Sequence, residues 1–440
     1  MSILTRINPN ERGRFFLLAL LLFFNSMILE SNEVVATSGF ISSIGVSQIL
    51  LVWAIDMTIV IVTSGIYSLF VDNTDRRRLV ISLYFGFSII YLLLYGFFNV
   101  GAGSMIGYGV LLVINDQQWL LFPLVIWALA NDMFNISEAK RLFPILGSAA
   151  FIGGMVGNGL AAATAQIVTT NYTLLLFNAV LILGGGALLF FALRRIALTT
   201  KRSRSAEKVS EVLQEGLGFI REVPIFRYLT FAMILLGIGL NAIEFEFLRS
   251  VFSTYSDPGQ LQTFYGTFKI AVAIGLLIIQ GFVATWLLNR LGFKYIFVIL
   301  PVIMLSGLIA ALMWPGLLGI VLGNYLVRVS KNGLDDPSIK AFQGLVPDER
   351  RGRVSAFMDG YLYPIGSIIG CVIVGSMLIL NAAHVIDEAT ARILYLSAAI
   401  ISAGLAVYLA SRIHLHYDAS MLNWRLKRRK RSSALADIEL

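Results

Sequence analysis

Apolar residues in this chain occur in continuous blocks of about 20 residues, separated by shorter polar segments. A block of that length can cross a bilayer as an α-helix, and the alternating pattern typical of a membrane barrel is absent from the sequence. The sequence therefore predicts an all-α integral membrane protein. About twelve spans are expected, near residues 14–38, 47–71, 79–99, 118–135, 143–166, 172–195, 226–252, 261–288, 293–313, 315–330, 353–381 and 389–411.

The segment 100–117 fits this pattern poorly. The part from Ile106 to Ile114 is apolar, but the polar run Asn115-Asp116-Gln117-Gln118 interrupts it. Two placements stay open: the outer end of the third span, or the start of the fourth.

Composition supports a membrane protein and disfavours an enzyme. Hydrophobic residues make up 57% of the chain and charged residues 14%, whereas a soluble domain carries about 25% charged residues. The single cysteine, Cys371, excludes an intrachain disulfide and is expected to pack in a helix interface. Two of the three histidines, His414 and His416, lie near the C-terminal tail. We expect no catalysis, no cofactor and no metal, and the chain has no phosphate-binding loop of an ATP-driven pump.

The basic residues predict the orientation of the chain. All but three of the 34 lysines and arginines fall in segments that would lie on one side of the membrane, the exceptions being Arg249, Lys269 and Arg392. Under the positive-inside rule both termini are cytoplasmic, and a bacterial inner membrane is the expected location. The net charge of +8 is then mostly a topology signal, and we expect no nucleic-acid partner. The basic tail Arg425–Arg431 is expected to contact anionic lipid headgroups.

Landmarks of the first half of the chain recur in the second half. Glu30 and Glu244 are 214 residues apart, and Gly154 and Gly366 are 212 residues apart. Two similar six-helix bundles would arise from such a parallel repeat. The predicted parts are an N-terminal bundle (1–195), a cytoplasmic linker (196–225), a C-terminal bundle (226–412) and a basic tail (413–440).

Two further patterns concern the linker and the small residues. The linker has apolar residues at helical spacing from Val209 to Ile220, so it is either an amphipathic helix or a plain tether. Small residues concentrate in the fifth and eleventh spans, where they would allow close helix packing. These are Gly153, Gly154, Gly157 and Gly159, then Gly366, Gly370 and Gly375.

A charge in a bilayer is costly and is usually retained for function, so charged residues inside the predicted spans are of interest. The candidate pathway residues among them are Glu30, Glu33, Asp56, Glu244 and Lys269. Glu30 and Glu33 share one helical face and could bind a cation, carry a proton or recognise an amine; the alternative is a position at the outer end of the span, facing water.

Asp56 and Lys269 fall at similar depths of equivalent spans, the second and the eighth. We therefore predict that these two residues form an ion pair between the two halves. Glu246 and Arg249 are three residues apart and predict a local, structural pair, which leaves Glu244 as the better pathway candidate of the two nearby acids.

The arrangement of six plus six helices with a charged linker resembles the major facilitator superfamily. Gly65, Asp72 and Arg76 to Arg78 resemble a degenerate form of that superfamily's loop motif, which normally has a glycine near the aspartate. The resemblance implies a gating role for Asp72 and Arg76. The alternative is that the arginines only fix the topology.

The segment 127–147 combines a tryptophan, an Ala-Asn pair, the run Glu-Ala-Lys-Arg, an aromatic residue, a proline and a glycine: Trp127, Ala130, Asn131, Glu138, Ala139, Lys140, Arg141, Phe143, Pro144 and Gly147. This pattern resembles the ATP/ADP antiporter (nucleotide transporter) family of plastids and intracellular bacteria. A plain structural turn, with Ser137 as the helix N-cap, would also explain this segment. Alternatively, Glu138, Lys140, Arg141 and Arg353, the counterpart of Arg141, form an inner gate, in which Glu138 pairs with a cation of the other half.

We expect a secondary active transporter that moves a small solute by alternating access, with protons as the candidate coupling ion. Two alternatives stay open. One is a nucleotide exchanger, although the net acidic interior is a poor environment for a triphosphate. The other is a membrane subunit or scaffold that does not transport.

Overall fold

The structure is a computed structural model that describes residues 8–70, 76–101, 104–165, 172–194, 209–291, 293–314, 316–343, 346 and 348–436. Throughout these ranges the regular structure is helical, without strands. Eleven helical segments in them are long and apolar enough to cross a membrane. The predicted fold class, an all-α membrane protein, is thus confirmed.

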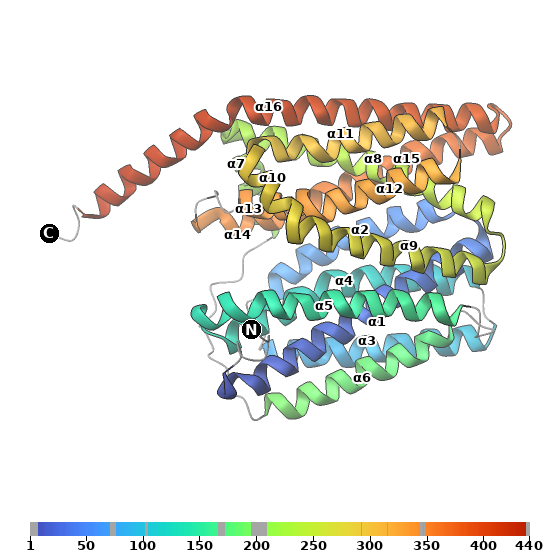
Figure 1. Ribbon diagram of the computed structural model, residues 1–440, viewed down its shortest axis with the longest axis horizontal. Coiled ribbons are helices and arrows are strands. Elements are labelled where there is room, and N and C mark those ends of the chain that lie inside the picture. Colours follow the sequence, from blue (N-terminus) through green and yellow to red (C-terminus); the bar gives the residue numbers. More distant parts are fainter. Residues whose placement is uncertain are drawn as a thin grey trace. The chain divides into compact units, whose positions relative to one another are not determined.

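The chain divides into two compact units, which are described separately. The first unit comprises Met1–Glu207 and Val251–Ile274. Within it α1 packs against α4, α5 and α6, and α3 packs against α4 and α6 (Figure 1). The helices of this unit are α1 (Arg12–Ile44), α2 (Ile49–Phe70), α3 (Arg76–Asn99), α4 (Ser104–Met133), α5 (Ile136–Thr164), α6 (Thr173–Leu193) and the first part of α9 (Pro258–Ile278), with a short 3-10 turn, η2 (Pro9–Glu11), before α1.

The second unit comprises Lys208–Ser250 and Gly275–Leu440. Here α11 packs against α12 and α16, and α15 packs against α16. Its helices are α7 (Val209–Glu222), most of α8 (Pro224–Thr254), α10 (Ala284–Leu291), α11 (Phe293–Met313), α12 (Leu317–Ser330), α13 (Asp336–Gln343), α14 (Asp348–Phe357), α15 (Tyr363–Ala382) and α16 (Glu388–Ala436), with π-helical turns η3 (Ile279–Val283), η4 (Lys331–Asp335) and η5 (Met358–Leu362).

Residues 104–133 form one continuous helix, α4, which decides the placement of the ambiguous segment: it is the start of the fourth span. The polar run does not break the helix, and three of its four side chains, Asn115, Gln117 and Gln118, are buried. The Gln118 amide donates to Asn25 (2.9 Å) and accepts a hydrogen bond from the Tyr91 hydroxyl (2.5 Å). Interhelical hydrogen bonds of this kind satisfy polar side chains inside a membrane bundle.

The predicted span at 315–330 corresponds to α12, which is the first part of a longer helical segment. α12 has 14 residues and continues through the π-helical turn η4 into α13. It is the one predicted span that is not among the eleven described segments long and apolar enough to cross a membrane.

The described part of the predicted linker is a helix and not a plain tether. α7 packs against α14, where a Cβ on Gly216 would lie only 2.5 Å from the Phe357 ring. Phe219 and Ile220 are buried, and Glu222 forms an ion pair with Arg350 (3.1 Å). The amphipathic pattern is therefore used for packing on the second unit.

Glycines fix two close helix crossings, one in each unit. A Cβ on Gly153 or Gly157 of α5 would lie 2.1 Å from the backbone oxygen of Phe23 or Met27 in α1. In the second unit a Cβ on Gly366 of α15 would lie 2.2 Å from the backbone oxygen of Ile234 in α8. Such contacts are possible only without a side chain, which confirms the packing role of these glycines. Gly375 has nothing within 4 Å of its Cβ position and takes no part in a crossing.

Candidate functional site

The first part of α9 packs on α5, and this contact places Lys269. The Gln262 amide donates to the Ala161 carbonyl (2.8 Å), and the Thr263 hydroxyl donates to the Ala162 carbonyl (3.3 Å). Gly266 allows the close approach, because a Cβ there would lie 2.9 Å from the Asn158 carbonyl oxygen. Residues 251–274 therefore belong to the first unit by contact, although the sequence assigns them to the C-terminal bundle. The predicted boundaries at 195, 225 and 412 stay a prediction.

Lys269 lies between two acids of α1. Its ammonium is 2.8 Å from a Glu30 carboxylate oxygen and 2.5 Å from a Glu33 carboxylate oxygen. The lysine side chain is 8% exposed, and the glutamates are 28% and 29% exposed. We call Glu30, Glu33 and Lys269 the lysine triad. Both glutamates lie within the 33-residue helix α1. Their position along the membrane span stays a prediction.

Two neutral groups also contact the acids of the lysine triad. The Asn158 amide donates to Glu30 (3.0 Å), and the Tyr265 hydroxyl donates to Glu33 (3.4 Å). Each carboxylate thus has a cationic and a neutral partner, an arrangement that offsets the loss of water in a buried site. With all three members ionised, the triad keeps one excess negative charge.

The ion pair predicted between Asp56 and Lys269 is replaced by other contacts. Lys269 is bound by the α1 glutamates, and the carboxyl of Asp56, which is only 2% exposed, lies beside Asp116 and Gln117 of α4. Asp116 is a site residue that was not predicted, because the polar run that contains it interrupts an apolar segment as a break between spans would. Its position within an otherwise apolar segment was the available signal.

Glu244, predicted as a pathway acid, binds polar residues of α12 in the second unit. Arg328 contacts its two carboxylate oxygens at 2.5 and 3.1 Å, and the Asn324 amide donates to it at 2.9 Å. Arg328 was counted among the loop cations, but it lies in the last turn of α12. The four-residue spacing from Asn324 to Arg328, which puts both on one helix face, was a usable signal.

The predicted pair between Glu246 and Arg249 is confirmed, with a distance of 3.7 Å. It is part of a larger network, because Glu246 also binds Arg392 (2.7 Å) and accepts a hydrogen bond from the Tyr395 hydroxyl. Glu246 is only 3% exposed. The network joins α8 to α16, and we interpret it as structural.

The predicted gating residues of the first unit form contacts within that unit. Arg141 binds Glu11 (2.7 Å), and Glu138 lies 3.7 Å from Arg14 of α1. Glu138 thus lies beside a cation of its own unit, and its pairing with a cation of the other half stays a prediction.

The N-cap of α5 is Asn135 and not Ser137. Its side chain accepts the Glu138 backbone N–H while the Glu138 carboxylate accepts the Asn135 backbone N–H, both at 2.9 Å. This reciprocal pair is a capping box and fixes where the helix begins.

The remaining predicted gating residues are described only in part. Asp72 lies outside the described residues. Arg76 begins α3 and Lys140 lies in the first turns of α5, but the positions of their side chains are also outside the description. Arg353 lies in α14, at the start of the candidate span Arg353–Ala382.

Three π-helical turns of the second unit lie near one another. The Gln280 amide of η3 donates to the Asn332 carbonyl of η4 (3.3 Å), and the Tyr363 hydroxyl, just after η5, donates to Asp335 of η4 (2.7 Å). Asp335 lies outside the candidate spans, and burial raises its pKa to about 7. Turns of this kind are frequent at functional sites and at bends, and periodicity does not predict them.

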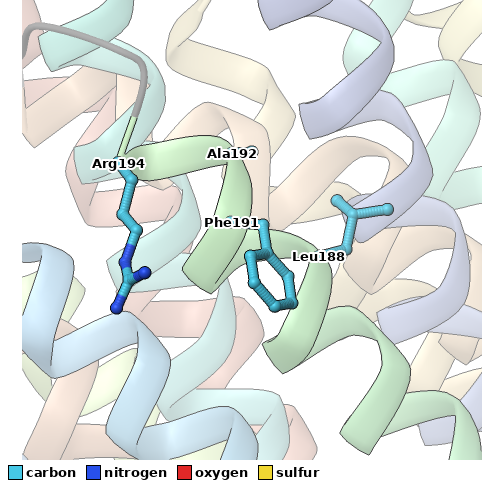
Figure 2. A pocket seen from close by; sticks show the side chains of 4 residues that line it. All are labelled: Leu188, Phe191, Ala192 and Arg194. Carbon is cyan, nitrogen blue, oxygen red and sulfur yellow. The ribbon is translucent and has the colours of Figure 1, made fainter.

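A surface hollow of about 540 Å³ lies at the end of α6 (Figure 2). Leu188, Phe191, Ala192 and Arg194 line it. None of the predicted pathway residues is among these four, and Phe191 is 65% exposed, as expected of a lipid-facing side chain. We therefore place the candidate site at the lysine triad and not at this hollow.

Long apolar helices with internal ion pairs define the class: a multi-pass membrane protein. Its fold is that of facilitator-type transporters. The structure resembles the nucleoside transporter NupG with a TM-score of 0.65 at 14% identity, covering 91% of this chain and 98% of that one. It resembles a bacterial homologue of the iron transporter ferroportin with a TM-score of 0.63 at 17% identity, covering 92% and 100%. The predicted fold resemblance is confirmed.

Residues 107–314 match the model of the TLC ATP/ADP transporter family, a region that includes the segment 127–147. The predicted resemblance to nucleotide transporters is therefore confirmed. An ADP,ATP carrier protein 1 of Chlamydia muridarum is 22% identical, over 60% of this chain and 57% of its own length. A chloroplastic ADP,ATP carrier protein 1 of Arabidopsis thaliana is 21% identical, over 60% and 47%. The matches thus span about half the length of these relatives.

Proposed function

We propose that this chain is a secondary transporter that moves a small solute across a membrane by alternating access, without catalytic chemistry of its own. The main support is the lysine triad, in which a nearly buried lysine joins α9 to α1. Intramembrane ionisable residues usually belong to a transport pathway. The family match and the shared fold agree with this proposal.

The contacts of the lysine triad suggest how a cycle would work. In the conformation described here, Lys269 attracts both glutamates and holds α9 against α1. A proton or a substrate cation at Glu30 or Glu33 would compete with Lys269 and weaken that attraction. A ligand shifts a conformational equilibrium by its difference in affinity for the two states, so such competition would favour movement of α9.

Nucleotide exchange is a second candidate, favoured by the ATP/ADP transporter match. Lys269 and Arg328 are then the natural partners of phosphate oxygens, through charge-assisted hydrogen bonds. Each is already bound to carboxylates in the present conformation, so phosphate would have to displace Glu30 and Glu33 from Lys269, or Glu244 from Arg328. The additional acids Asp56 and Asp116 oppose the entry of a polyanion.

Counterflow in proteoliposomes tests the proposal. We expect purified protein, reconstituted into vesicles loaded with unlabelled solute, to take up labelled solute of at least one class. The panel comprises ATP and ADP, nucleosides, amines and sugars, and uptake confined to ATP and ADP would favour the second candidate.

The control for counterflow is the Lys269→Met variant in matched vesicles, whose signal should fall to that of empty liposomes. Correctly folded protein without counterflow of any solute would contradict the proposal and favour a membrane scaffold that does not transport.

We further propose a bacterial inner-membrane location with both termini in the cytoplasm. The basic segment Arg425–Arg431 belongs to the C-terminal part of α16 and is proposed to contact anionic headgroups. Alkaline phosphatase, which is active only outside the cytoplasm, should be inactive when fused at either terminus, and a fluorescent protein that requires the cytoplasm should be bright at both. An active phosphatase at the C-terminus would contradict this topology.

A further inference from the structure

The carboxyl of Asp56 and its surroundings form a second polar site in the first unit, distinct from the lysine triad. Asp56 comes from α2, and Asp116 and Gln117 come from α4. Asp56 is 2% exposed and Gln117 is 7% exposed. Two carboxyl groups are thus brought together inside a membrane bundle, where like charges repel strongly.

This site contains polar atoms that the protein does not satisfy. One carboxylate oxygen of Asp56 and both polar atoms of the Gln117 side chain are buried without a hydrogen-bond partner. The Gln117 side chain lies against the Asp56 carboxyl, so these buried polar atoms are part of the same site. Buried polar groups are normally paired, and each exception calls for an explanation.

The charges around the site favour a cation over an anion. Glu33 and Lys269 are the charged groups that act on Asp116 from α1 and α9, and Tyr91 of α3 lies within its electrostatic reach. Lys269 is already bound to two glutamates, so the carboxylates of the triad largely compensate its positive charge. The acids at the site therefore keep an excess of negative charge, which an anionic ligand would increase.

We propose that Asp56, Asp116 and Gln117 bind one small monovalent cation, either a proton or Na⁺. The cation reduces the repulsion between the two carboxyl groups. Oxygen atoms are suitable ligands for a proton and for Na⁺. A proton would be shared between the two carboxyl groups. Sodium would in addition use the Gln117 carbonyl oxygen. The inference deepens the proposed function, because the bound cation would be the coupling ion of that transporter.

Thermal stability of the purified protein tests cation binding without any assumption about transport. Sodium chloride is titrated against choline chloride at constant ionic strength, and a second series varies the pH in choline. A cation that binds the native state stabilises it, so wild-type Tm should rise by several degrees either with sodium or with falling pH. The first outcome identifies Na⁺, the second a proton.

Variants assign the effect to this site. Asp56→Asn and Asp116→Asn should each lose most of the sodium-dependent or pH-dependent rise in Tm, because the amide carries no charge at any pH. Gln117→Leu should reduce a sodium effect but leave a proton effect. Glu388→Gln is the control, since Glu388 is an exposed acid of the second unit and should keep the wild-type response.

Two outcomes would overturn the inference. One is a wild-type Tm that responds to neither sodium nor pH. The other is a response that Asp56→Asn and Asp116→Asn retain in full. Either result can occur in a protein that passes the counterflow assay, so failure of this inference is distinguishable from failure of the proposed transport function.

Discussion

The Lys269→Met variant is expected to lose transport and much of its stability. Removing the ammonium leaves Glu30 and Glu33 facing each other without the cation that both contact. Breaking a buried ion pair in this way typically costs about 3–5 kcal/mol. Because each glutamate keeps more than a quarter of its surface exposed, we expect the lower end of that range. Thermal melting of the purified protein and counterflow measure the two effects.

A rescue variant separates the charge effect from simple loss of packing. With Glu30→Gln and Glu33→Gln added to Lys269→Met, the uncompensated charges disappear, so stability should return in large part while transport stays absent. Lys340→Met is the matched control, because Lys340 is 60% exposed and pairs with Asp359 near the surface, where an ion pair contributes about 0–1 kcal/mol. A Lys269→Met variant with the same Tm as Lys340→Met and with normal transport would contradict the role assigned to Lys269 in the lysine triad.

The Gly157→Ala variant is expected to disrupt the first unit by forcing α5 away from α1. The new Cβ would lie 2.1 Å from the Met27 carbonyl oxygen, and backbone cannot move aside as a flexible side chain can. Overpacking of this kind costs about 1–3 kcal/mol, occasionally more. The displacement would also move the neighbouring Asn158, which donates to Glu30, so transport should decline together with Tm.

Gly147→Ala is the matched control in the same helix, because its Cβ position has nothing within 4 Å. Alanine favours a helix over glycine by about 0.8–1 kcal/mol, so this variant should be neutral or slightly more stable. Gly366→Ala should reproduce the damage in the second unit, where its Cβ would lie 2.2 Å from the Ile234 oxygen. Equal melting temperatures for Gly157→Ala and Gly147→Ala would contradict the close crossing.

The first long helix of each unit presents an acid that is bound in a similar way. Glu30 of α1 is bound by an amide, Asn158, and a cation, Lys269. Glu244 of α8 is bound by an amide, Asn324, and a cation, Arg328. The partners come from helices that are not equivalent in the predicted repeat. The two acids therefore have the same need for neutralisation, which different parts of the chain meet.

The sequence by itself determined the helices and drew attention to the important charges. In a bilayer every backbone polar group must be satisfied within the chain, so a long apolar block has to be helical whatever its neighbours are. For the same reason Glu30, Glu33, Asp56, Glu244 and Lys269 stood out, since charges are rare in such blocks. The glycines of the crossings were also visible, because small residues in apolar helices have few other uses.

Only the tertiary structure decided which charges meet. The apolar blocks carry little periodicity, so the sequence does not show how each helix is rotated or how deeply it is placed. The contact of α9 with α5 at Gly266 determines the rotation and the depth of α9. It therefore places Lys269 beside Glu30 and Glu33 instead of Asp56. Likewise, Arg328 became a partner of Glu244 because it lies in the last turn of α12, on the helix face that also presents Asn324 to Glu244. Ion pairing depends on ångström-scale distances between helices, and those distances follow from side-chain packing across the whole bundle.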